Sequence, residues 1–239
     1  MHLVRLSLVI CLSLLPASAA AQPPPAEDPA PGSRVAAGTD IVAATAYVWR
    51  GFVPVPSLTF QPSVFVTVGD LTFTSWSNLA RRGPNGRTFT EHDFVADYSR
   101  GVGAVTVSAG WVAYAFPDLT QDTRTHELYA GLAFGGPAAP FVRVYQDLGA
   151  GDGTYVQAGV SHEWRAGRHV TVGASLSGGY NHHQWVAGSG FSDLLGTVRA
   201  SLPTPIARLR VEPFLSRSHT LDRQRFPSRT FGGVGLTIR

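Results

Sequence analysis

Residues 57–68, with the sequence SLTFQPSVFVTV, alternate apolar and polar side chains, and this alternation limits the possible folds more than any other feature. Successive side chains of a β-strand point to opposite faces, whereas the faces of a helix repeat every 3.6 residues. The segment is therefore predicted to be a strand with one apolar and one polar face. After a turn at Gly69 and Asp70, Leu71 and Phe73 restart the pattern. The apolar face comprises Leu58, Phe60, Pro62, Val64, Val66 and Val68, and Phe65 is the exception on the polar face.

The rest of the chain repeats this pattern to its last residues, and no segment shows helical periodicity. Only 15% of the residues are charged, against about 25% in ordinary soluble domains. We predict an all-β chain of about twelve antiparallel strands. The predicted strands are residues 39–51, 57–68, 71–79, 89–99, 103–115, 124–134, 139–147, 154–164, 169–180, 192–202, 207–218 and 230–238.

The connections between these strands alternate between short and long. Bacterial transmembrane β-barrels have an even number of strands, short turns on the periplasmic side and longer loops outside. Ten residues rise ~33 Å, and a tilt near 40° leaves ~25 Å along the membrane normal, which matches the apolar band of such barrels. The sequence therefore predicts a transmembrane, up-and-down antiparallel β-barrel with short periplasmic turns and longer extracellular loops.

Charged side chains on several polar faces indicate which face of the barrel is inside. Buried carboxylates and guanidiniums are costly unless they are paired or hydrated, so a water-filled lumen accommodates them best. A soluble lipocalin-like barrel is the alternative, with its apolar face inside and its charges outside. The predicted pore-lining residues are Arg50, Glu91, Asp93, Asp97, Glu127, Arg143, Asp147, Arg199, Arg208, Arg210 and Glu212.

The predicted lumen charges separate into two halves. The acidic half holds Glu91, Asp93, Asp97 and Glu127, and the basic half holds Arg50, Arg199, Arg208 and Arg210. Because the fourth and tenth strands would lie opposite each other, a transverse field would cross the pore and orient dipolar solutes. The alternative is local pairing, since Asp193 and Glu212 fall in the basic half and Arg143 in the acidic half.

Arg50 and Gly51 are expected to end the first strand near the outer rim. Arg50 would there either attract anions at the pore mouth or pair across the barrel wall, while Gly51 relieves a tight bend. A barrel of about twelve strands would have a bore of order 10 Å, unless side chains or a loop close it.

The first 21 residues have the features of a secretory signal peptide, with Arg5 near the start, an apolar core and small residues at the cleavage site. Residues 22–38 are rich in proline and are predicted to form a disordered periplasmic tail before a barrel over residues 39–239. The only cysteine, Cys11, lies in the signal peptide, so the mature chain would hold no disulfide. We expect export to the outer membrane of a Gram-negative cell, where the partners would be outer-membrane lipid and the barrel-assembly machinery.

Three motifs resemble those of the proteobacterial TorF-type porin family, a group of uncharacterised outer-membrane β-barrels. They are YVWRGF at residues 47–52, FQPSVFV at 60–66 and SWSN at 75–78. The family shows an aromatic-x-x-Arg-Gly element, a Gln-Pro in the next strand and a Trp-x-Asn ending the third. The match continues through THELYAGLAF, VYQDL and GTYVQAGVSHEW, and covers most of the chain after residue 39. The resemblance implies an outer-membrane barrel with a channel role and transfers no solute specificity.

The expected function is passive diffusion of small hydrophilic solutes or ions through a charged lumen, with the solute unknown. One alternative is a closed barrel that acts as a scaffold or adhesin through its loops. Another is an outer-membrane lipid-modifying enzyme, which would need a Ser–His pair near the membrane boundary. The adjacent pairs Ser161–His162 and Ser218–His219 would face opposite sides of a strand, so we expect no enzyme.

No cofactor or metal is expected, and His182, His183 and His219 are interpreted as exposed loop histidines. Nucleic acid is not an expected partner either. The formal net charge of +3 comes from arginines that do not gather into a basic stripe.

Overall fold

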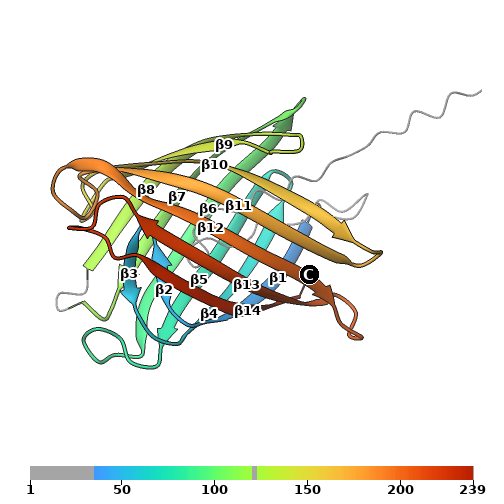
Figure 1. Cartoon of the computed structure of the whole chain (residues 1–239), viewed down its shortest axis with the longest axis horizontal. Coiled ribbons are helices and arrows are strands. Elements are labelled where there is room, and N and C mark those ends of the chain that lie inside the picture. The colour runs from blue at the N-terminus through green and yellow to red at the C-terminus, as the bar shows by residue number, and fades with distance from the viewer. Residues whose placement is uncertain (1–34, 120–122, 239) are drawn as a thin grey trace, which may run out of the picture.

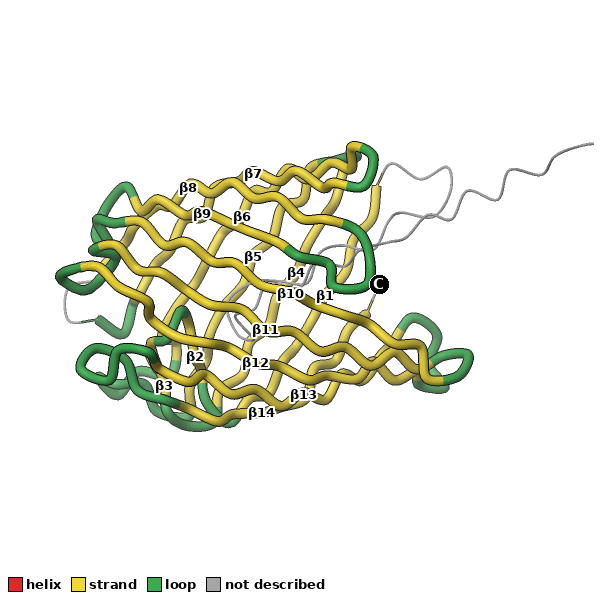
Figure 2. Tube along the Cα trace, turned by 45° about the horizontal axis from the view of Figure 1, so that its top comes forward, coloured by secondary structure: helices red, strands yellow, loops and turns green. Residues whose placement is uncertain are grey.

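The chain folds into a closed barrel of twelve antiparallel strands (Figures 1 and 2). The computed structural model describes residues 35–119 and 123–238. Within these residues, no helix is long and apolar enough to cross a membrane. The predicted all-β barrel is confirmed. Its strands are β1 (Val35–Ala44), β4 (Thr59–Val68), β5 (Leu71–Ala80), β6 (Phe89–Val102), β7 (Val105–Phe116), β8 (Thr123–Phe134), β9 (Phe141–Asp147), β10 (Thr154–Ala166), β11 (Val170–His182), β12 (Ser189–Pro203), β13 (Leu209–Thr220) and β14 (Arg229–Ile238).

The first strand differs from its prediction at both ends. β1 begins at Val35 and ends at Ala44, whereas the sequence pattern predicts a strand over residues 39–51. It pairs with β4 along its whole length and with β14 at the closure of the barrel. Residues 35–38, which the composition assigns to the tail, therefore belong to the barrel. The predicted signal peptide and residues 22–34 lie outside the described residues.

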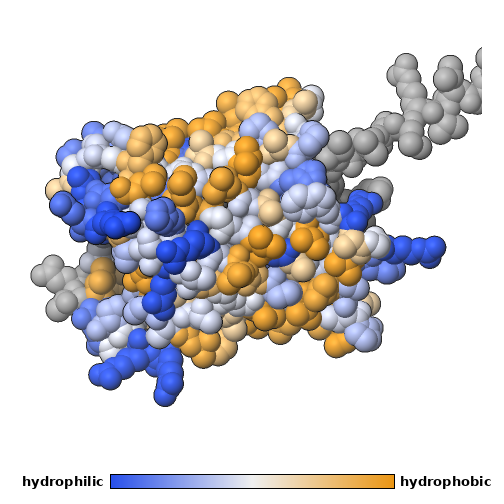
Figure 3. Space-filling model, in the orientation of Figure 1, coloured by the Kyte–Doolittle hydropathy of each residue, from blue (hydrophilic) through white to orange (hydrophobic). Residues whose placement is uncertain are grey.

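The outer surface of the barrel is apolar in its middle. On β4, Val64 is 56% exposed and its neighbour Phe65 is 4% exposed, so alternate side chains face outward and inward as predicted. Val234, Leu236 and Ile238 of β14 are also exposed. In Figure 3, hydrophobic residues gather between hydrophilic residues at the two ends. This arrangement contradicts the lipocalin-like alternative, which would place the apolar faces inside.

The two ends of the barrel differ in their connections. One end carries tight turns, such as Gly69–Asp70 between β4 and β5, and there the start of β1 lies beside the end of β14. The other end carries longer connections, including residues 81–88, 148–153 and 221–228. We call these the turn end and the loop end.

Residues 45–58, between β1 and β4, fold into the barrel at its loop end. They form a hairpin of β2 (Tyr47–Trp49) and β3 (Phe52–Val55), which we call the lumen hairpin. Thr45 N donates to Gly232 O at 2.9 Å, and Arg229 Nη2 donates to Pro56 O at 2.7 Å, so both legs are tied to β14. Residues 46–55, which the sequence pattern assigns to the end of the first strand and to an outer loop, therefore lie inside the lumen.

Candidate functional site: the lumen and its hairpin

Arg50 and Gly51 form the tip of the lumen hairpin. Both have positive φ angles, 51° and 86°, as the central residues of a two-residue type I′ turn do. A non-glycine residue in this region costs roughly 1–2 kcal/mol, so the contacts of the Arg50 side chain have to offset that strain. The prediction that Arg50 ends a membrane-spanning strand is wrong, because the chain leaves the barrel wall at Thr45.

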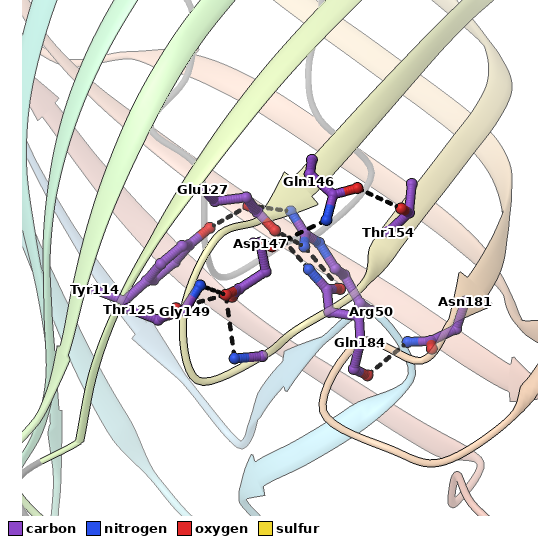
Figure 4. A network of polar contacts seen from close by, with 11 residues as sticks. Arg50, Tyr114, Thr125, Glu127, Gln146, Asp147, Gly149, Thr154, Asn181 and Gln184 are labelled. Carbon is purple, nitrogen blue, oxygen red and sulfur yellow. Dashed lines mark hydrogen bonds and ion pairs between the residues drawn. The ribbon is translucent and has the colours of Figure 1, made fainter.

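Arg50 makes an ion pair across the lumen (Figure 4). Its Nη1 and Nη2 atoms donate to Oε1 and Oε2 of Glu127 at 2.6 and 2.8 Å, a bidentate geometry. The guanidinium carbon lies 4.6, 4.0 and 4.8 Å from the ring centroids of Trp49, Tyr145 and Tyr155. Burial alone would lower the pKa of Arg50, but the Glu127 carboxylate raises it above its ordinary value. Arg50 therefore stays charged.

Glu127 is fully buried and accepts two further hydrogen bonds. The Tyr114 hydroxyl donates to Oε2 at 2.8 Å, and Gln184 Nε2 donates to Oε1 at 2.5 Å. Gln184 Oε1 also accepts a hydrogen bond from Arg50 Nη1 at 3.0 Å, so this amide bridges the ion pair. Gln184 lies in the connection between β11 and β12, where Asn181 Nδ2 donates to its backbone carbonyl at 3.0 Å. One buried network thus joins the hairpin, strands β7, β8 and β11, and an outer loop.

Asp147 anchors the neighbouring loops. Its Oδ1 accepts hydrogen bonds from the Thr125 hydroxyl at 2.5 Å and from the backbone nitrogens of Gly149 and Gly151 at 2.8 and 3.1 Å. Trp185 N then donates to Gly151 O at 2.8 Å. Residues 148–153 and 183–188 are therefore held together at the loop end.

Both faces of the lumen hairpin are buried against the barrel wall. One buried apolar cluster joins Tyr47 and Trp49 to β5 and β7–β10, and another contains Ala46 and Val48 with Leu195 and Phe231 of β12 and β14. The hairpin therefore narrows the loop-end half of the lumen. Its ring contacts, with centroid distances, are Tyr47–Trp76 at 5.7 Å, Trp49–Tyr114 at 6.1 Å and Phe52–Phe226 at 4.9 Å.

The turn-end half of the lumen contains charged side chains that are less buried. Arg199 Nη2 lies 2.6 Å from Glu163 Oε1, with side-chain exposures of 22% and 37%. Arg210 Nε donates to Ser201 Oγ at 2.6 Å, and the same hydroxyl donates to Glu212 Oε1 at 2.8 Å. These charged groups are partly exposed, and we call the part of the lumen that they line, between the hairpin and the turn end, the vestibule.

The structure places nine of the eleven predicted pore-lining residues on inward faces of strands. Of the other two, Arg50 is at the hairpin tip and Arg208 is exposed in the connection between β12 and β13. That these residues line a conducting pore stays a prediction. The nine are Glu91, Asp93 and Asp97 on β6, Glu127 on β8, Arg143 and Asp147 on β9, Arg199 on β12, and Arg210 and Glu212 on β13.

The predicted basic half of the lumen contains arginines that pair with carboxylates. β6 and β12 do lie opposite each other in the closed strand order, as predicted. However, Arg199 pairs with Glu163, and Arg50 pairs with Glu127 of the acidic half. Asp40 on β1 and Asp193 on β12 add buried carboxylates to the half predicted to be basic. These ion pairs and carboxylates favour pairing of the lumen charges over a transverse field between a basic and an acidic half.

Several buried residues of the lumen were not predicted from the sequence. Asp40 follows the alternation of β1 and could have been found, but Tyr114, Tyr145 and Gln184 come from segments far from Arg50 in the chain. No local pattern connects them.

Of the three predicted loop histidines, His183 lies in the connection between β11 and β12, whereas His182 and His219 lie on β11 and β13. His182 Nδ1 lies 2.5 Å from Ser189 Oγ. Among the residues that the structure describes, no group of three His, Cys, Asp or Glu side chains is placed to hold a metal ion.

The fold is similar to that of solved outer-membrane porins. A KdgM porin matches with a TM-score of 0.57 at 11% identity, over 84% of this chain and 98% of that chain. A KdgM porin in complex with disordered oligogalacturonate gives 0.55 and 12%, over 84% and 98% of the two chains. A NanC porin gives 0.55 and 9%, over 84% and 99%. No protein-family model and no curated protein sequence matches the chain. At these identities the similarity establishes the shared barrel fold.

Proposed function

We propose that this chain is an outer-membrane channel for small hydrophilic solutes and ions, narrowed at its loop end by the lumen hairpin. The observation that carries the proposal is the partly exposed, charged vestibule inside a barrel whose outer surface is apolar. The fold shared with the KdgM and NanC porins supports it, as does the resemblance to TorF-type porins. The chain would reach the outer membrane after signal-peptide removal, with help from the barrel-assembly machinery.

The hairpin would limit the size of the solutes that can cross the lumen. Side-chain contacts and a few hydrogen bonds hold it against the wall, and it is not one of the strands of the closed sheet. Such a segment can shift without breaking the barrel, because the wall keeps all of its strand pairs. We therefore expect small current steps whose opening depends on movement of the hairpin.

The charges near the hairpin favour cations. Carboxylates outnumber guanidiniums there, and a constriction lined by carboxylates selects cations. Oligogalacturonate, the polyanion named with one of the KdgM porins, is therefore not the solute that we propose. The residues concerned are Glu91, Asp93, Glu127, Asp147 and Asp193, against Arg50 and Arg229.

Planar-bilayer recording of the purified chain tests this function. A salt gradient should give discrete steps with a reversal potential on the cation-selective side. Absence of any step would contradict a channel, and an anion-selective reversal potential would contradict the role given to the carboxylates.

The scaffold or adhesin alternative predicts no current under any condition, including after removal of the hairpin. It also leaves the partly exposed charges of Arg199 and Glu163 without a role. The same recording therefore separates it from the channel.

The enzyme alternative gains one contact that the sequence did not reveal. On the outward faces of β5 and β6, Ser77 Oγ lies 2.9 Å from His92 Nδ1. In serine hydrolases the nucleophile bonds Nε2, and Nδ1 faces the orienting carboxylate. This pair is therefore not arranged as a catalytic dyad, and a phospholipase assay comparing the chain with Ser77→Ala should show no difference.

A further inference from the structure

Outward-facing side chains of β13 change abruptly from apolar to basic near the loop end. Leu215 is 61% exposed, and the next two outward positions, Arg217 and His219, are exposed as well. Residues two apart on a strand lie on the same face about 6.6 Å from each other. The apolar band therefore ends directly against a guanidinium and an imidazole.

The same change occurs on other strands. On β8, exposed Leu128 is followed toward the loop end by His126 and Arg124, and the last outward residue of β11 is His182. On the described strands, the outward positions at this end carry no carboxylate. Figure 3 shows hydrophilic residues gathered at the loop end beside the hydrophobic band.

Arg217 is open to a ligand. Its Nη1 donates to Thr230 Oγ1 at 2.8 Å, which leaves other N–H groups of its fork available. Its cross-strand partner on β12 is Gly196, and a Cβ at Gly196 would meet nothing within 4 Å. Because glycine has no side chain, Gly196 leaves the Arg217 guanidinium uncovered on the β12 side.

We propose that Arg217 and His219 bind the phosphate group of a phosphorylated glycolipid in the outer leaflet of the membrane. Guanidinium groups recognise phosphate with two parallel hydrogen bonds, and basic groups at a membrane surface attract anionic lipid headgroups. The acyl chains of the same lipid would lie on Leu215 and Val198, which are 61% and 55% exposed. The inference rests on the membrane placement of the proposed function.

Titration of the purified full chain in a neutral detergent at pH 6 tests the site. The probes are lipid A with both phosphates and its dephosphorylated form, and complexes are counted by native mass spectrometry. We expect the phosphorylated form to bind more tightly, and the double variant Arg217→Gln, His219→Gln to weaken that binding at least about fivefold. The matched control is Arg100→Gln, an exposed arginine at the turn end of β6, which should bind like the unchanged chain.

Equal binding of the two lipid forms, or equal loss in the Arg100→Gln control, would overturn the site. Planar-bilayer currents of the same variants keep this result separate from the proposed function. Normal currents with no phosphate preference would refute the lipid site alone, whereas phosphate-dependent binding without currents would refute the channel alone.

Discussion

Arg50 combines a strained backbone with a buried charge. The backbone strain of its positive φ angle is offset by two hydrogen bonds to Glu127, by a hydrogen bond to the Gln184 amide and by contacts with three aromatic rings. Removing one partner of a buried ion pair is strongly destabilising, because the other charge stays behind without its counter-ion. At the residue scale, this pair should therefore decide whether the hairpin stays in the lumen.

Replacing Arg50 by Met should destabilise the docked hairpin by about 3–5 kcal/mol, and Glu127→Gln should have a similar effect. The double variant should recover much of the loss, since no unpaired charge remains. Urea unfolding in lipid vesicles, arranged as a double-mutant cycle, measures the coupling. Arg199→Met is the control, because its pair with Glu163 is partly exposed and should change stability by about 0–1 kcal/mol. Strictly additive losses at Arg50 and Glu127 would refute the buried pair.

At the scale of elements, the lumen hairpin depends on a turn that only certain residues can adopt. Gly51 has a φ of 86°, and a Cβ there would lie 3.2 Å from the Phe226 ring in the connection between β13 and β14. The tip is thus fitted between the barrel wall and an outer loop.

Gly51→Ala should cost about 1–2 kcal/mol and loosen the hairpin, because alanine strains the backbone and crowds Phe226. We expect more frequent openings in bilayer recordings. Gly86→Ala is the matched control, with a φ of 88° in an outer loop and open space around its Cβ. Gly86→Ala should introduce backbone strain similar to that of Gly51→Ala, but it should not change the bilayer currents. If both variants opened equally often, the hairpin would not be the cause.

At the scale of the whole molecule, the barrel separates an apolar exterior from an interior that holds charged side chains. Carboxylates predominate beside the hairpin, while the vestibule carries charges of both signs. Ion selectivity should therefore be set at the loop-end half.

Replacing Glu91 and Asp93 together by Gln and Asn should shift the reversal potential toward zero under a salt gradient, because two of the five carboxyl groups near the hairpin are removed. Asp70→Asn, in an exposed turn at the far end, should leave the potential unchanged. A shift of equal size in both variants would show that selectivity is a property of the total charge.

The barrel could be predicted because its signal is local. Alternation fixes strand and facing within ten residues, as in β4 and β14, and nine of the eleven predicted pore-lining residues have side chains on inward faces of strands. The hairpin could not be predicted, because Tyr47, Val48 and Trp49 are all buried and show no alternation. Its turn uses Arg-Gly, whereas type I′ turns usually carry Asn-Gly or Asp-Gly.

Removal of the lumen hairpin tests most directly whether this segment narrows an otherwise open barrel. Replacing residues 46–57 by a short Gly-Ser linker should leave the strand pairs of the wall intact and free a bore of about 10 Å. Single-channel conductance should then rise several-fold over the unchanged chain, whereas the same replacement of residues 84–86, in another outer loop, should not change it. An unchanged conductance after removal of the hairpin would contradict the account.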